Sequence, residues 1–276
     1  MGSLFRYRNL TIGGSMVVAL LLVGLLAPLL APYNPYLQNL AASFEPPSSA
    51  HLFGADQYGR DVFSRVLYGA RLSLLEIVVS VGLSLLVGVP LGLISGYFGA
   101  IVDQTLTWIM DLLYAFPGIV LAILIVAILG PSLFNTLLAI SIFSVPVYTR
   151  LTRNLTLKVK QMDYVEAAIA LGAGPWRILF NHILRNAMLP ILIQSTFTAG
   201  DVILSASGLS FLGLGAQPPA AEWGSMMSEG RNFLGVATHL SLFPGAVITF
   251  AVLGLNIFGD GLRDRLDPRF RTAGRR

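Results

Sequence analysis

Six long apolar stretches constrain the fold of this 276-residue chain more than any other feature. The hydrocarbon core of a bilayer is about 30 Å thick, and a helix needs roughly 20 apolar residues to cross it. The stretches are continuous rather than alternating, and in lipid such segments satisfy their backbone hydrogen bonds as helices. We therefore predict an all-α integral membrane protein with six transmembrane helices, at Leu10–Ala31, Leu72–Ile94, Leu106–Leu129, Leu133–Tyr148, Ala187–Ala206 and Leu240–Phe258.

The composition excludes the soluble classes of protein. Only 12% of the residues are charged, whereas a soluble domain carries roughly 25%. The chain has no cysteine, which excludes a disulfide scaffold, a zinc ribbon, an iron–sulfur centre and a cysteine nucleophile. The net charge of +4 does not indicate a nucleic-acid partner, because the basic residues gather beside the apolar stretches. In that position they mark the cytoplasmic side of a membrane.

The lysines and arginines also predict the orientation. With the amino terminus inside, fourteen of the 18 basic residues are cytoplasmic: two before the first span, six from Arg150 to Arg185 and six from Arg263 onward. The positive-inside rule therefore places both termini in the cytoplasm. The first span exceeds the 7–15 apolar residues typical of a signal peptide, so we expect it to be retained. The basic residues on the outer side are Arg60, Arg65, Arg71 and Arg231.

This orientation divides the chain into three parts. Residues 1–71 form an amino-terminal tail, the first span and an outer loop. Residues 72–270 form a core of five spans, whose longest cytoplasmic loop is 150–186. Residues 271–276 form a basic tail.

The sequence contains no motif for nucleotide hydrolysis or metal binding. A P-loop needs a lysine directly after a glycine, and the only lysines, Lys158 and Lys160, follow other residues. There is no GxSxG or HExxH, and the three histidines are far apart. We therefore expect no catalytic residue, no metal site and no cofactor bound by this chain.

The cytoplasmic loop is predicted to fold as a helical hairpin. Met162–Leu171 is expected to be a short helix, with Asp163 as its N-cap and Glu166 completing a capping box. Gly172 suits the left-handed position that ends a helix. Pro175 suits the first turn of a second helix that runs to Asn186. Such a hairpin either docks into a groove of a partner or packs against its own bundle.

The same loop resembles a known signature. Glu166-Ala167-Ala168, three residues and then Gly172 are similar to the EAA motif of permease subunits of binding-protein-dependent ABC importers. The resemblance implies that this loop is the coupling helix that contacts the ATPase subunit. Arg185 stands where that motif has a proline. The residues to which the resemblance assigns ATPase coupling are Asp163, Glu166, Ala167, Ala168, Gly172 and Gly174.

Three further motifs occur in the order expected for the "C" subunit of the dipeptide, oligopeptide and nickel branch of these importers. Ala206 departs from that pattern, because a glutamate is expected a few residues before the Leu-Ser-Phe run. The motifs that carry the resemblance are Gly54–Arg65, Leu209–Gly215 with Pro218-Pro219 and Trp223-Gly224, and Gly259–Asp264 with Asp267-Pro268-Arg269.

The resemblance implies a type I ABC importer permease fold in a prokaryotic cytoplasmic membrane. Its implied partners are a second homologous permease subunit, two ATPase subunits that hold ATP and Mg, an extracytoplasmic substrate-binding protein and the lipid bilayer. The implied substrates are dipeptides or oligopeptides, with nickel or metal chelates as the alternative. A carrier or channel that works without an ATPase would instead show inverted internal repeats, and the sequence shows none.

Several charged residues invite a functional interpretation. Asp111 and Asp201 lie inside predicted spans, where a carboxylate costs roughly 2.5–3.5 kcal/mol. They either line the translocation path or serve as hydrogen-bonded structural groups. In the outer loop, four residues either contact the binding protein or satisfy one another in a folded hairpin: Asp56, Arg60, Asp61 and Arg65.

A ridge of small residues, Gly88, Gly92 and Gly96, recurs every four residues in the second span. Such a ridge allows close approach of another helix. That helix belongs either to a partner subunit or to the same bundle.

Overall fold

The computed structural model describes residues 8–266, and these form an all-helical protein whose one β-bridge joins Ala55 and Asp61. Arg6, the basic tail 271–276 and the motif 267–269 lie outside the described residues. The long helices are α2 (Arg8–Leu30), α3 (Val62–Phe98), α4 (Ala100–Tyr114), α5 (Gly118–Leu129), α6 (Leu133–Lys160), α9 (Leu184–Phe211) and α11 (His239–Leu266). The shorter ones are η1 (Leu40–Ala42), α7 (Asp163–Ala170), α8 (Pro175–Arg177), η2 (Ile178–Ile183), α10 (Trp223–Gly230) and η3 (Arg231–Phe233).

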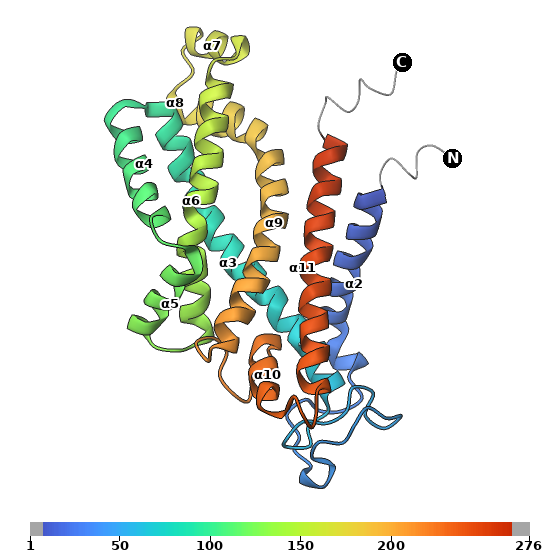
Figure 1. The fold of residues 1–276 in the computed structure, drawn as a ribbon. Coiled ribbons are helices and arrows are strands. Elements are labelled where there is room, and N and C mark those ends of the chain that lie inside the picture. The colour runs from blue at the N-terminus through green and yellow to red at the C-terminus, as the bar shows by residue number, and fades with distance from the viewer. Residues whose placement is uncertain (1–7, 267–276) are drawn as a thin grey trace.

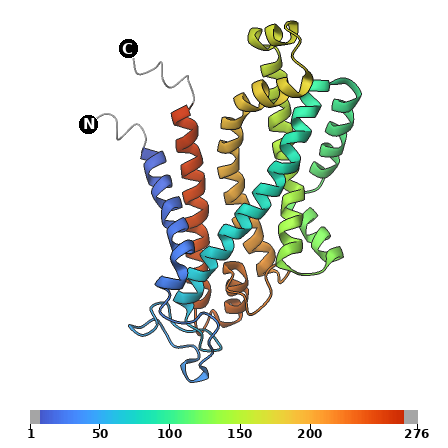
Figure 2. The same cartoon turned by 180° about the vertical axis from the view of Figure 1, so that it is seen from behind.

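The helices form an elongated bundle with two distinct ends (Figures 1 and 2). We call the end that carries α7 the hairpin end, and α2 begins and α11 finishes toward it. The opposite end, which we call the loop end, is made by residues 31–61 and α10. Helix α3 crosses the bundle from the loop end to the hairpin end, so it contacts both regions (Figure 2).

Five helices among the described residues are long and apolar enough to cross a membrane, and the bent pair α4–α5 makes a sixth candidate span. The third predicted span is therefore broken, with an angle of 85° between its two helices. Pro117 is the residue before α5, with extended backbone at φ −54° and ψ 128°. Proline has no N–H to continue a helix and disfavours the helical conformation for the residue before it. The prediction of a single helix at Leu106–Leu129 is therefore wrong: the structure has two helices there, α4 and α5.

The other spans were predicted too short at their polar ends. Helix α3 begins at Val62, ten residues before the predicted start at Leu72, and Asp61 Oδ2 caps it by accepting from Ser64 N at 2.7 Å. Helix α6 continues past Tyr148 to Lys160. These added turns contain polar residues, so hydropathy does not reveal them.

The glycine ridge of α3 packs inside the chain, against α6. A Cβ built on Gly88 would lie 2.8 Å from Val145 O, and one on Gly92 would lie 2.5 Å from Thr149 O. Both separations are too short for non-bonded atoms, so only glycine allows this approach of the two backbones. Of the two interpretations of the ridge, packing within one bundle is confirmed.

Candidate functional site

The hairpin at the hairpin end begins with α7. Its N-cap is Met162, which has extended backbone and makes no side-chain cap hydrogen bond. The N–H groups of Val165 and Glu166 donate to Met162 O at 2.8 and 3.2 Å. The predicted capping box is therefore absent, because Asp163 is already the first helical residue. Asp163 and Glu166 still place two negative charges in the first turn, where they interact favourably with the helix dipole.

The end of α7 is the sharp turn that the sequence predicts. Gly172 has φ +84°, its N–H donates to Ile169 O at 2.9 Å, and the N–H of Ala173 donates to Ala168 O at 3.0 Å. This pair of hydrogen bonds is a Schellman motif, which needs a left-handed residue at the glycine. Pro175 then opens α8, as expected.

The hairpin has one anchored face and one open face. Val165 is fully buried in a cluster with Leu93 of α3, Val159 of α6 and Ile178, Leu179 and Ile183 of the following helix. The opposite side exposes apolar residues to solvent: Leu171 is 90% exposed and Trp176 is 59% exposed. We name this open face the hairpin surface; it comprises Tyr164, Ile169, Leu171, Trp176 and Phe180, next to the exposed Glu166 and Ala167.

The second arm of the hairpin is not a separate helix. Helical backbone continues from Pro175 to Phe211 and includes the π-helical turn η2. The helix predicted to end at Asn186 is therefore the first part of the fifth span. No loop separates this arm of the hairpin from α9.

Asp111 and Asp201 differ in their surroundings. Asp111 Oδ1 pairs with Arg150 Nη2 at 2.5 Å, beside a cavity of about 320 Å³ between α3, α4 and α6. Asp201 is exposed on α9 and makes no hydrogen bond or ion pair with the described part of the chain. An unpaired carboxylate inside a span needs water or a partner protein beside it.

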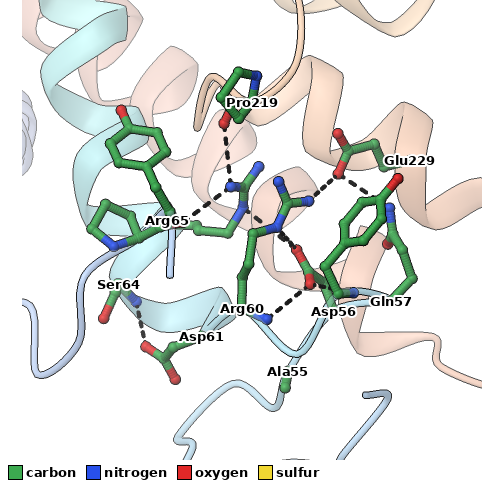
Figure 3. Close-up of polar contacts among 12 residues, drawn as sticks. Ala55, Asp56, Gln57, Arg60, Asp61, Ser64, Arg65, Pro219 and Glu229 are labelled. Atoms are coloured by element: carbon green, nitrogen blue, oxygen red, sulfur yellow. Dashed lines mark hydrogen bonds and ion pairs between the residues drawn. The ribbon is translucent and has the colours of Figure 1, made fainter. Parts of the chain in front are cut away.

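The four charged residues predicted in the outer loop form a buried network at the loop end (Figure 3). Arg60 Nε pairs with Asp56 Oδ2 at 2.5 Å, and Arg60 Nη2 pairs with Glu229 Oε2 at 2.7 Å. Arg65 donates to the carbonyl oxygens of Pro35, Pro219 and Ala220 at 3.2–3.4 Å. The remaining residue, Asp61, caps α3 and pairs with His51.

The burial of this network bears on the expected contact with a binding protein, which stays a prediction. Arg60 and Arg65 are 2% and 1% exposed, and the carboxylates of Asp56 and Asp61 are buried with them. A partner can touch only the outer surface of the segment that these side chains hold in place. The self-satisfied folded loop, the other interpretation, describes their geometry.

Sequence reasoning missed three glutamates at the loop end. Glu229 pairs with Arg60 from 169 residues away, a contact that no spacing in a single sequence indicates. Glu222 caps α10 and is fully buried. Glu76 of α3 is also fully buried. Its signal was available: Gly69, Ser73 and Glu76 follow the spacing of one helix face.

The arrangement defines a multi-pass helical membrane protein with a protruding helical hairpin. Comparison with known proteins gives its family. Residues 88–272 match the family described as binding-protein-dependent transport system inner membrane component. Residues 3–47 match the N-terminal TM domain of oligopeptide transport permease C. The chain therefore belongs to this family: it is a non-catalytic permease subunit of a binding-protein-dependent ABC importer and a multi-pass protein of the bacterial inner membrane.

Three relatives are similar along nearly their whole length. The chain is 45% identical to the dipeptide transport system permease protein DppC of Alkalihalophilus pseudofirmus, over 95% of this chain and 86% of the relative. It is 44% identical to the probable D,D-dipeptide transport system permease protein DdpC of Escherichia coli, over 92% and 85%. It is 44% identical to the glutathione transport system permease protein GsiD of Pectobacterium atrosepticum, over 94% and 86%.

Solved structures of the MetNI methionine ABC transporter in inward-facing conformations share the fold. One matches 73% of this chain and 96% of its own chain, with a TM-score of 0.60 at 18% identity. A second crystal form matches 72% and 95%, with a TM-score of 0.59. At this identity the match shows an ABC transporter permease fold and nothing about substrate.

Proposed function

We propose that this chain is the C-type subunit of a type I importer for small peptides, driven through the hairpin by two ATPase subunits that hold ATP and Mg. The observation that carries the proposal is the hairpin itself. The hairpin surface stays exposed in the described chain, most of all at Leu171, while the opposite face is anchored to the bundle by Val165.

The anchoring cluster explains how a push on the hairpin opens the bundle. It joins α7 to residues of α3, α6 and η2, so these elements move with the hairpin rather than independently of it. Well-packed side chains transmit displacement because the cluster has low compressibility. The coupling residues Asp163, Glu166, Ala167, Ala168, Gly172 and Gly174 then present the contact face or shape its turn.

Asp201 is the candidate for the translocation path. Its unpaired carboxylate on α9 suits attraction of the positively charged amino terminus of a peptide. Asp111 is neutralised by Arg150 and serves as a structural pair near the hairpin end. A second homologous permease subunit completes the path. The outer loop ends at Asp61, where α3 begins, so the boundary between the outer loop and the core belongs there and not at residue 71.

The names of the relatives favour peptides over nickel or metal chelates, since they mention dipeptides, D,D-dipeptides and glutathione. The test is reconstitution in vesicles with the second permease, the ATPases and the binding protein. We expect ATP-dependent uptake of radiolabelled dipeptide that stops when either the ATPases or the binding protein is left out. Uptake by this chain alone would contradict the proposal, and nickel uptake without peptide uptake would contradict the substrate class.

A further inference from the structure

Helix α9 has an open face that runs from the middle of the bundle to the loop end. The helix lies between α6 and α11, and α3 crosses behind it (Figures 1 and 2). Asp201 and Leu204 are exposed on α9, and Gly208 follows one turn later. Residues three, four and seven apart share one face of a helix. The unpaired carboxylate of Asp201 is therefore continuous with the surface that Leu204 and Gly208 form.

A pocket of about 630 Å³ begins on this surface and lies toward the loop end. This volume is typical of small-molecule sites, which are mostly apolar and have a few polar groups to orient the ligand. The wall is built by α9, α10 and α11. Its lining residues include Leu204 and Gly208 of α9, Met227 of α10, and Leu242, Gly245 and Ile248 of α11.

Two hydroxyl groups of the wall already have partners inside the protein. Ser241 Oγ donates to Met227 O at 3.3 Å, and Thr249 Oγ1 donates to Gly245 O at 2.9 Å. An apolar group can therefore enter the pocket without leaving these hydroxyls unpaired. A polar group would lose its water without a free partner among them, which is unfavourable.

The position of Asp201 indicates what kind of space the pocket opens onto. A charged side chain inside a span faces a water-filled cavity or another protein, because contact with hydrocarbon is costly. Asp201 is exposed and lies one turn from Leu204, the nearest lining residue of α9 along the chain. The pocket and the carboxylate therefore open onto the same polar space and not onto the acyl chains of lipids.

We propose that this pocket receives the apolar side chain of the first residue of the transported peptide while Asp201 pairs with the peptide's amino group. The inference rests on the function proposed above and adds a substrate preference to it. The amino group and the first side chain of a peptide are attached to the same carbon atom, so they bind side by side. The Cβ atoms of Asp201 and Leu204 are about 5–6 Å apart, as for any residues three apart on a helix, which suits both groups. The second side chain of an extended peptide points to the opposite side.

The experiment is uptake of two radiolabelled isomers, leucylglycine and glycylleucine, by vesicles that contain the complete importer. The variant Gly245→Leu fills the pocket with a new side chain. A Cβ at this position meets Met227 Sδ and Cε at 3.5 Å, an ordinary contact, so the substitution fits the fold. We expect uptake of leucylglycine to fall about tenfold relative to glycylleucine, because the pocket serves only the first side chain. Gly208→Leu, whose Cβ would lie 3.8 Å from Ile119 Cδ1, should act in the same way.

The same binding protein delivers both isomers to parent and variant, so a changed uptake ratio reports on the permease. Leu192→Ala is the control: this leucine is exposed on α9 but does not line the pocket, and the ratio should stay that of the parent. Asp201→Asn should lower uptake of both isomers by a similar factor, since both have the same amino group.

An unchanged ratio in Gly245→Leu and Gly208→Leu would overturn the proposal. So would an equal loss of both isomers, or failure of both variants to assemble, because the second permease subunit rather than the peptide would then occupy the pocket. If only one variant assembles, its ratio decides alone. A parent importer that takes up neither isomer contradicts the proposed function itself, whereas uptake with unaltered selectivity in the variants contradicts only the pocket.

Discussion

The two ends of the bundle contain the same kind of turn but differ in which side chains they bury and which they expose. Both carry the same turn: Gly172 ends α7 with φ +84°, and Gly213 ends α9 with φ +79°, each followed by the hydrogen bonds of a Schellman motif. At the loop end the surrounding charges are buried and paired. At the hairpin end a small apolar anchor supports an exposed apolar surface. The loop end pairs its buried arginines within one chain, whereas the hairpin end leaves an apolar surface exposed.

The largest expected effect is on the loop-end network. Arg60→Ala leaves Glu229 without its cation and Asp56 with only Arg65, whose Nε is 3.7 Å from Asp56 Oδ2. Removing one partner of a buried pair costs about 3–5 kcal/mol. We expect a strongly lowered melting temperature and little assembled transporter in membranes. Arg71→Ala, which removes an exposed arginine of the same helix, is the control and should change stability by less than about 0.5 kcal/mol. Equal effects of the two variants would show that the network is dispensable.

The matched glycines separate strain from function. A Cβ meets nothing within 4 Å at either position, so valine at Gly172 or Gly213 is penalised only by its backbone conformation. We expect each variant to lose about 1–3 kcal/mol of stability. Only Gly172→Val should uncouple ATP hydrolysis from peptide uptake in reconstituted vesicles. Normal coupling in Gly172→Val, or uncoupling by Gly213→Val as well, would contradict the role of the hairpin turn.

Substitutions on the hairpin surface should weaken binding of the ATPase without changing the stability of the permease. Leu171 is 90% exposed, so Leu171→Ala should leave the melting temperature of the permease unchanged. If the ATPase covers this side chain, its affinity should fall about tenfold, equivalent to 1.4 kcal/mol. Titration of ATPase onto the permease in nanodiscs measures this. Leu212→Ala, an exposed leucine at the loop end, should leave the affinity as it is.

The smallest expected effect is a pH dependence. Burial raises the pKa of the Glu222 carboxyl above its usual range, although the N–H groups of Gly224 and Ser225 lower it in part. Since the folded chain holds this proton more tightly than the unfolded chain, stability is lost as the pH rises above the ordinary range of a glutamate. Glu222→Gln should flatten this slope, as measured by thermal unfolding of the purified transporter at a series of pH values. A steeper slope in the variant would reverse the sign and refute the assignment.

The sequence by itself determined the features that depend on neighbours along the chain. Continuous apolar stretches predicted the spans, because a lipid environment selects helices by composition and length. The turn at Gly172 and the start at Pro175 were predicted because left-handed backbone and a fixed φ are properties of single residues. The sequence therefore predicts most of the hairpin, apart from its N-cap and the extent of its second arm.

Only the tertiary structure decided which groups meet. Pro117 breaks its span, whereas Pro146 lies inside the uninterrupted α6, and nothing in their local sequence separates the two cases. The sequence leaves open whether the charges of the outer loop contact a partner or one another. The structure shows that Arg60 bonds to Glu229 and that Arg65 bonds to the carbonyl oxygen of Pro219. Burial and pairing depend on residues that lie far apart in the chain. A single sequence therefore contains these residues but does not show which of them are close together.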